Sequence, residues 1–539
     1  MTHPSPEEKR TSRIVELLIL AGIVGLIAAL RVRFLSVPFE RDEGDYALGG
    51  WLLLHGHPLY RDFYTMRLPG VYLTFAAIQA IFGHSVVGAH FALLLANSAT
   101  VVLVYFIGRS LFGARSGLGA ALFYGVTSSL IVTLGQAANS EHFINLWVAI
   151  GLAAIISIRT AETWRLVAAG ISMGFAFITK QHAALLILMG WLWMMLISAA
   201  DSQQSLLTNG VRRSLKYFAA VMVPVGLTAV LVAVWGVYDS FRRWAFEYAG
   251  AYVGTRTLEE GMILLRAELE ALPGLIWPIC LLALLGIIGS AMTRSDRKAF
   301  TMLSCYLVTS LIMFSIGLYF RAHYFLFVYP PLAMFAGKGL DLICQRIANR
   351  RVSMACGTAV AVLAAGYPIL GERSHFFDRS PEMIARARYG INPFPESEAI
   401  GKYIAERTLP DESILILGSE PQIYWHSGRL SATPHVHMYP LMETQPLALE
   451  MQEELIRQAE AARPRYIVLV SISSSWFKTA DSPQRLFQWF DAFTRDRYAI
   501  EAYVDIPLNG VGEVRPFDRT ALNVSATGNY ISILRRVGD

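Results

Sequence analysis

Long apolar segments alternate with short polar linkers over most of the chain, up to about residue 372. A bilayer crossing by a helix takes roughly 20 consecutive apolar residues. Segments of that kind begin near Arg13, Val86, Ser116, Glu141, Arg165, His182, Ser214, Pro273, Ala299, His323 and Val352. The pattern predicts a polytopic α-helical membrane protein with about 11 transmembrane helices.

A further apolar segment, Leu68 to Phe82, is short and opens with Pro69-Gly70. If it does not cross the bilayer, the Lys and Arg clusters between the later segments fall on the same side as Lys9, Arg10 and Arg13. Basic residues accumulate on the cytoplasmic side of membrane proteins. We therefore predict an interfacial or re-entrant helix here and a cytoplasmic N-terminus.

Beyond about residue 373 the chain carries more charge and more proline, and it has no segment long enough to span. Apolar runs of strand length occur at Ser413 to Gly418, Tyr466 to Val470, Tyr498 to Ile506 and Tyr530 to Leu534, and a helix is expected at Thr444 to Ala462. This alternation predicts a small α/β domain. We expect a transmembrane domain over 1–372, which includes a first outer loop at 36–85, and an extracytoplasmic domain over 373–539.

Composition agrees with a membrane protein, since 54% of the residues are hydrophobic and 16% are charged. The net charge of +5 comes from short clusters between apolar segments, which argues against nucleic acid and for membrane lipids as partners. None of the four cysteines has metal-ligand spacing, and all lie in or beside apolar segments, so no disulfide is expected.

Three carboxylates follow the first apolar segment: Asp42, Glu43 and Asp45. Asp42 and Asp45 would share a face if a helix begins here, with Glu43 turned away. These groups could stabilise the positive end of that helix, or one of them could act as a general base beside a polar substrate. The sequence pattern leaves both interpretations open.

Two more polar groups are predicted at the outer ends of membrane helices. Asn139, Ser140 and Glu141 could cap a helix, or they could meet a metal or the hydroxyls of a sugar. Cations recur at Arg67, at Lys180-Gln181-His182 and at Arg321-Ala322-His323-Tyr324. Each could reach lipid headgroups by itself, and together they would suit an anionic lipid phosphate.

The first outer loop also resembles a known family. Arg41 to Ala47, Gly56 to Phe63 and Arg67-Leu68-Pro69-Gly70 are similar to the first outer loop of the polytopic GT-C glycosyltransferases. Within these, the chain most resembles the dolichyl-phosphate-mannose protein mannosyltransferase and aminoarabinose transferase group, glycosyltransferase family 39, over about residues 10–345.

The resemblance implies a GT-C-like fold and an inverting transfer from a polyprenyl-phosphate-linked sugar to an acceptor hydroxyl. It implies that Asp42 is the base, that Arg67 meets the lipid phosphate, although Leu68 replaces a proline of the family pattern, and that Glu141 is a second acidic position. A bacterial inner membrane is the expected location.

We take Asp42 and Glu43 as catalytic candidates. The candidate substrate-binding residues are Asp45, Tyr60, Asp62, Arg67, Glu141, His142, Lys180, Arg321, His323 and Tyr324. No cofactor is required by this hypothesis, and a divalent metal ion is left open. The acceptor is left open among protein, glycan and lipid. The alternative function is a transporter or flippase of a lipid-linked glycan precursor, which would need polar groups along a path through the bilayer.

Overall fold

The computed structural model describes residues 6–157, 163–198, 206–517 and 528–538. The chain forms two compact units. The first comprises Met1–Leu35, His90–Leu231 and Arg256–Asp378, and the second comprises Ser36–Ala89, Val232–Thr255 and Arg379–Asp539. The whole of the first outer loop, 36–85, thus belongs to the same unit as the C-terminal domain.

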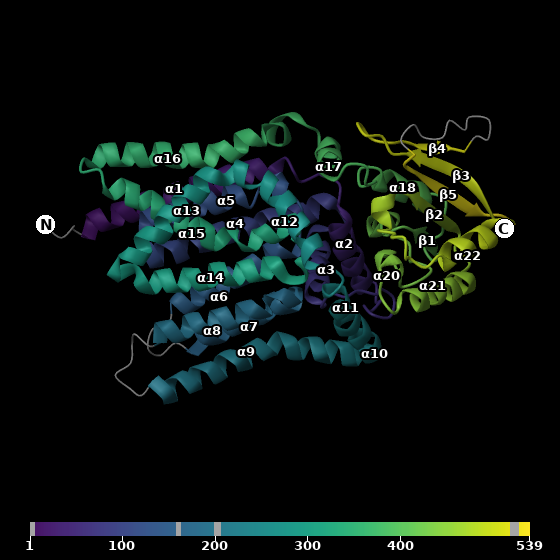
Figure 1. Ribbon diagram of the computed structural model, residues 1–539, viewed down its shortest axis with the longest axis horizontal. Helices are drawn as coiled ribbons and strands as arrows, with labels where there is room; N and C mark the ends of the chain where they lie inside the picture. Colours follow the sequence, from purple (N-terminus) through teal and green to yellow (C-terminus); the bar gives the residue numbers. More distant parts are fainter. Residues whose placement is uncertain (1–5, 158–162, 199–205, 518–527, 539) are drawn as a thin grey trace. The chain divides into compact units, whose positions relative to one another are not determined.

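The first unit is helical, with a helix at or near the start of each predicted apolar segment (Figure 1). Its helices are α1 (Pro6–Val32), α4 (Val86–Phe112, whose first turn lies in the second unit), α5 (Ala114–Thr127), α6 (Ser140–Ile156), α7 (Thr163–Thr179), α8 (Ala184–Ser198), α9 (Leu206–Trp235), α12 (Leu258–Ala271), α13 (Pro273–Met292), α14 (Arg297–Ser315), α15 (Tyr329–Gln345) and α16 (Arg350–Gly371). The polytopic helical prediction is confirmed.

Among the described helices, 6 are long and apolar enough to cross a membrane. They are Arg13–Val32, Val86–Phe112, Gly210–Trp235, Gly274–Met292, Arg294–Leu318 and Arg350–Gly371. Shorter apolar helices include Ser140–Ile156, Thr163–Thr179 and Gln181–Ile197. The total of about 11 crossings stays a prediction.

One predicted helix starts later than its apolar segment. The residues after His323 form a 3₁₀ helix, Ala322–Phe327, and α15 begins at Tyr329. Pro330 and Pro331 explain the shift, because proline lacks an N–H and its ring clashes with the preceding helical turn. A helix can therefore begin at these prolines but cannot continue through them.

The second unit joins the outer-loop helices α2 (Arg41–Leu54) and α3 (Gly70–Phe82) with a mixed α/β domain. With 13 residues, α3 is too short to cross a bilayer, which fits its predicted interfacial position. The 232–255 segment adds α10 (Tyr238–Arg242), a π-helical stretch (Arg243–Tyr248) and α11 (Ala249–Val253).

The C-terminal domain contains a five-stranded sheet in the order β1-β2-β5-β3-β4. Its strands are β1 (Ile414–Leu417), β2 (Tyr466–Ser471), β3 (Tyr498–Asp505), β4 (Val514–Pro516) and β5 (Tyr530–Arg536). β1 and β2 run parallel, and the other pairs are antiparallel. The helices are α17 (Pro381–Tyr389), α18 (Ser397–Ala405), α19 (Pro421–Ser427), α20 (Tyr439–Met442), α21 (Ala448–Ala462) and α22 (Arg485–Thr494).

The predicted α/β domain and its four strands are confirmed. The apolar runs of β1 and β2 are largely buried in the sheet, whereas β3 alternates between buried and more exposed residues. The sequence analysis missed β4, which is 3 residues long and mostly exposed. A short edge strand without alternating apolar residues gives no strand signal.

Glycines let α2 and α3 pack closely. A Cβ atom on Gly49 would lie 2.3 Å from the Tyr72 ring, and one on Gly50 would lie 2.7 Å from the backbone nitrogen of Ala76. Since Cβ atoms do not tolerate such distances, glycine is required at both positions. This close packing carries Tyr72 toward the acidic start of α2.

Glycines also allow α13 and α15 to pack closely in the first unit. A Cβ on Gly286 would lie 1.9 Å from the Phe335 carbonyl oxygen, and one on Gly339 would lie 1.9 Å from that of Leu282. Small residues allow such approaches between membrane helices. The α13–α15 contact therefore depends on the absence of side chains.

We predict that Gly286→Ala destabilises the protein by about 1–3 kcal/mol, because the added methyl group overpacks the α13–α15 contact. The measurement is the thermal unfolding temperature of the purified protein in detergent. Gly226→Ala in α9 is the matched control, since a Cβ there meets nothing within 4 Å. Equal unfolding temperatures for the two variants would contradict the prediction.

Candidate active site

Helix α2 starts at the acidic cluster, and its own residues define that start. Glu40 has the extended backbone of an N-cap residue, with φ −79° and ψ 177°. The Glu43 carboxylate accepts a hydrogen bond from the Glu40 N–H at 3.3 Å, as in a capping box. Glu43 is buried, and its carboxylate caps the start of α2. Of the two catalytic candidates, Glu43 therefore has a structural role.

Asp42 and Asp45 share a face of α2, as their spacing predicts, and both bind Arg67. One guanidinium nitrogen of Arg67 lies 2.7 Å from Asp42 Oδ1, and another lies 3.0 Å from Asp45 Oδ2. The Asp42 side chain is 28% exposed, whereas that of Asp45 is 0% exposed. Asp42 is therefore the carboxylate of this pair that a substrate can reach.

Asp45 holds the cluster together from inside. Besides Arg67, it accepts a hydrogen bond from the Tyr72 hydroxyl at 2.8 Å and lies 2.7 Å from Nε2 of His437. The Tyr72 hydroxyl also lies 2.6 Å from the Thr65 hydroxyl. With these partners around one buried carboxylate, Asp45 holds Arg67 in place, while its predicted role in substrate binding stays a prediction.

Arg67 is held from three more sides. Its guanidinium lies 5.2 Å from the centre of the Tyr46 ring, a cation–π contact. Its carbonyl oxygen accepts the Tyr60 hydroxyl at 2.7 Å, and its N–H donates to Thr65 at 3.1 Å. Tyr60 therefore supports Arg67 through the backbone.

The ion pairs of Asp62 are formed with residues outside the Arg67 cluster. Its carboxylate pairs with the adjacent Arg61 at 2.9 Å and with His57 at 3.1 Å. These are local contacts between partly exposed side chains. The structure thus gives Asp62 a surface ion pair, while its predicted role in substrate binding stays a prediction.

The second acidic candidate belongs to the first unit. Glu141 lies in the first turn of α6, is fully buried, and forms an ion pair with Lys180. His323 Nε2 lies 3.9 Å from the same carboxylate, and the Lys180 amine lies 4.3 Å from the centre of the Tyr324 ring. Four predicted residues are brought together here. Asn139 has the N-cap backbone of α6 but makes no capping hydrogen bond through its side chain.

The segment before α6 is irregular and buried, and two charged groups hold its backbone. Arg31 of α1 donates to the carbonyl oxygens of Ser128 and Gly135. The Glu372 carboxylate accepts the N–H groups of Ile131 and Val132, both at 2.7 Å. Irregular backbone at membrane depth needs such partners. The position of Glu141 thus depends on charges remote in sequence.

The other two candidates of the first unit are Arg321 and His142. The Arg321 guanidinium lies 5.2 Å from the centre of the neighbouring Tyr319 ring, and its backbone precedes the 3₁₀ helix Ala322–Phe327. His142 is buried in α6, one residue after Glu141.

Sequence reasoning missed Tyr72 and His437. Tyr72 sits in a segment expected to be apolar, and His437 is 392 residues from Asp45. Local spacing carries no signal for such a contact. The two histidines of His435-Val436-His437 are a local signal that could have drawn attention to this loop.

Among the residues that the structure describes, no group of 3 or more His, Cys, Asp and Glu side chains has an arrangement that could hold a metal ion.

Comparison with known proteins agrees with this architecture. Residues 67–226 match the family model described as dolichyl-phosphate-mannose-protein mannosyltransferase. The fold is similar to that of ArnT from Cupriavidus metallidurans in the apo state, with a TM-score of 0.56, 14% identity and 98% of both chains covered. The chain has the GT-C fold. The resemblance seen in the sequence is thus confirmed.

Two other solved structures are similar. ArnT from the same organism bound to undecaprenyl phosphate gives a TM-score of 0.56 at 14% identity and covers 84% of this chain and 93% of its own. The Archaeoglobus fulgidus oligosaccharyltransferase tethered with an acceptor peptide gives 0.51 at 14% identity and covers 94% and 75%. No curated protein sequence matches significantly.

The matched family range contains Arg67, Glu141, His142 and Lys180. Asp42 and Asp45 precede it, so their place in the site is supported by their contacts with Arg67.

We predict that Asp45→Ala lowers the free energy of unfolding by about 3–5 kcal/mol, because it leaves Arg67 and its neighbours without their buried partner. Thermal or denaturant unfolding in detergent measures this. Asp62→Ala, which removes a surface ion pair, should change it by less than about 1 kcal/mol. A similar decrease in the free energy of unfolding for both variants would show that the Asp45 cluster stabilises the protein no more than a surface ion pair does.

Proposed function

We propose that the protein is a glycosyltransferase that moves a monosaccharide from a polyprenyl-phosphate-linked donor to a hydroxyl group of an extracytoplasmic acceptor. The observation that carries the proposal is the pairing of the partly exposed Asp42 carboxylate with Arg67, beside the buried Asp45. The family match over 67–226 and the likeness to ArnT bound to undecaprenyl phosphate support the donor class.

In the proposed reaction, Asp42 takes the proton of the acceptor hydroxyl. The acceptor oxygen attacks the anomeric carbon from the face opposite the phosphate, and the bond between that carbon and the phosphate oxygen breaks. The electron pair leaves with the lipid phosphate, so the configuration inverts. A positioned carboxylate base contributes typically about 10² to 10⁴ in rate.

Arg67 is suited to contact both the base, Asp42, and the leaving phosphate in this reaction. A guanidinium has five N–H donors, and the ion pairs described above use one nitrogen for each aspartate. The same group can therefore orient Asp42 and meet a phosphate oxygen as negative charge develops there. The buried Asp45 keeps Arg67 in place throughout, which avoids reorganisation during the reaction.

In this proposal, the Glu141 cluster of the first unit is a second set of candidate substrate-binding groups. Lys180 is held between Glu141 and the face of Tyr324, and His323 lies beside the carboxylate. Arg321 adds a cation from the same chain segment. We assign these side chains to the phosphate and sugar of the donor. We place the protein in the bacterial inner membrane, with its C-terminal domain outside the cytoplasm.

We predict that Asp42→Asn, which keeps the size of the side chain but not its basicity, lowers sugar transfer by about 10² to 10⁴. Membranes containing the variant are supplied with radiolabelled polyprenyl-phosphate sugars, and label is followed from lipid to acceptor. Asp378→Asn is the control, because Asp378 is 55% exposed and its ion pair with Arg373 spans 3.8 Å.

Normal transfer by Asp42→Asn would overturn the assignment of the base. Movement of intact labelled lipid between leaflets, without transfer in wild-type membranes, would favour a flippase instead.

A further inference from the structure

In the C-terminal domain, loop residues beyond the ends of two parallel strands surround one side chain, and the place that they enclose is called the crevice below. Strands β1 and β2 are parallel neighbours, with Leu417 paired with Leu469 near their carboxyl ends. Ligands of open α/β sheets typically bind beyond the carboxyl ends of such strands. Here β1 continues into Gly418-Ser419-Glu420, and β2 continues into the 3₁₀ turn Ser473–Ser475.

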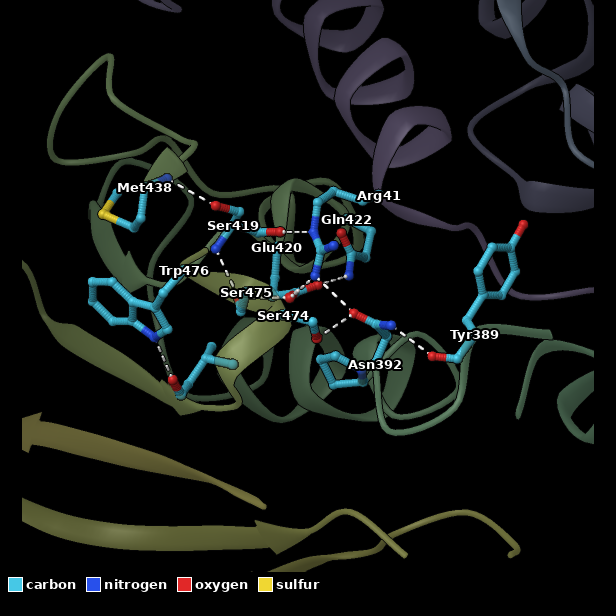
Figure 2. A network of polar contacts seen from close by, with 12 residues as sticks. Arg41, Tyr389, Asn392, Ser419, Glu420, Gln422, Met438, Ser474, Ser475 and Trp476 are labelled. Atoms are coloured by element: carbon cyan, nitrogen blue, oxygen red, sulfur yellow. Dashed lines mark hydrogen bonds and ion pairs between the residues drawn. The ribbon is translucent and has the colours of Figure 1, made fainter. Parts of the chain in front are cut away.

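These two strand ends are tied to each other. The Ser419 N–H lies 2.8 Å from the Ser475 hydroxyl oxygen, and the Ser419 hydroxyl accepts the Met438 N–H at 2.9 Å (Figure 2). Gly418 has φ +149°, and a Cβ there would lie 2.7 Å from Val470 Cβ. The crevice is thus built from tightly placed loops.

The occupant of the crevice is a side chain of the same protein, Arg41 (Figure 2). Its Nε donates to the Ser419 carbonyl oxygen, and its Nη2 lies 2.6 Å from Glu420 Oε1 and 3.0 Å from Asn392 Oδ1. The guanidinium carbon also lies 5.3 Å from the centre of the Phe394 ring and 5.4 Å from that of the Tyr439 ring. The Arg41 guanidinium thus has a carboxylate partner, two further hydrogen-bond acceptors and two aromatic rings beside it, as a bound cationic ligand would.

Glu420 is prearranged for this cation. Its side chain is 0% exposed, and it accepts the Ser475 hydroxyl at 2.7 Å and the Gln422 amide at 2.6 Å. Burial by itself would lower the pKa of Arg41, but the Glu420 carboxylate raises that pKa above its ordinary value. Removal of either charge would leave the other buried without its partner, which is strongly unfavourable.

The contact bears on the proposed base because Arg41 is the first residue of α2 and Asp42 is the second. Two further contacts fasten the same helix to the C-terminal domain. A Cβ on Gly44 would lie 2.7 Å from Gln422 Cβ, and His437 Nε2 lies 2.7 Å from Asp45. The first turn and a half of α2 is thus attached to the domain on both sides of Asp42.

We propose that the C-terminal domain is a positioning part of the catalytic site: its strand-end crevice binds Arg41 through Glu420 and thereby fixes the orientation of Asp42. Arg41 and Glu420 act through Asp42 and touch no reacting atom. The inference rests on the proposed role of Asp42 as base, and it gives the C-terminal domain a task in the transfer itself.

The test uses the full-length protein with Glu420→Gln, which keeps the shape of the side chain and removes its charge. We expect turnover at saturating donor to fall by about tenfold or more, because small misplacement of a catalytic group is costly. The KM for the donor should change by less than about twofold, since binding is not the step affected. Backbone amides of Arg41–Leu54 should exchange hydrogen faster.

Glu501→Gln is the matched control. Glu501 accepts hydrogen bonds from Tyr403 at 2.8 Å and Tyr466 at 2.9 Å and pairs with Arg535 at 3.3 Å, all within the C-terminal domain. This variant should leave turnover and the exchange of α2 unchanged. Should Glu420→Gln fail to fold, Arg41→Lys is used instead, since it keeps the charge but loses the forked donors.

A double variant separates positioning from general damage. In an Asp42→Asn background, Glu420→Gln should lower the residual transfer by less than about twofold, because both changes act through the same group. An additional loss as large as that in the wild-type background would overturn the proposal.

Unchanged exchange of α2 in Glu420→Gln would also overturn it, whatever the activity. If the wild-type protein transfers no sugar, the proposed function fails, and with it the catalytic meaning of the Arg41 contact.

Discussion

The ion pairs of Arg67 with Asp42 and Asp45 are the interaction on which the rest of the site depends. One cation lies between two carboxylates, and burial of such charges is tolerated when every partner is hydrogen-bonded. Asp45 meets that condition through Tyr72 and His437. This frees Asp42 to remain at the surface of the cluster, where a carboxylate can do chemistry.

The neighbouring acidic residues of α2 have different roles because their side chains have different surroundings. Glu43 satisfies the start of α2, Asp45 fixes Arg67, and Asp42 is partly exposed. Helix periodicity separates Glu43 from the face that Asp42 and Asp45 share, since successive residues point in directions about 100° apart. Within that shared face, Asp45 is buried and Asp42 is partly exposed.

Buried charge is used in the same way elsewhere. In the first unit, Arg31 and Glu372 satisfy backbone groups of the irregular segment before Glu141. In the second unit, Glu420 satisfies Arg41. In each case a charge that would be costly alone becomes a geometric constraint on the segment that carries a candidate residue. Stability and positioning therefore come from the same contacts.

The sequence by itself determined the helical membrane architecture, four of the five described strands of the C-terminal sheet, and the shared face of Asp42 and Asp45. These follow from local periodicity, because burial on one face repeats every two residues in strands and about every 3.6 residues in helices. Helix starts were less certain where proline interrupts an apolar run, as at Pro330 before the body of α15.

Tertiary structure alone decided that His437 and Tyr72 complete the Asp45 site and that Arg41 fills the crevice beyond β1 and β2. These contacts join residues up to 392 positions apart. Their energies depend on burial and exact mutual orientation, which no local pattern encodes. The acidic cluster could thus be found from its residue types, whereas the partners that give each carboxylate its role required the folded chain.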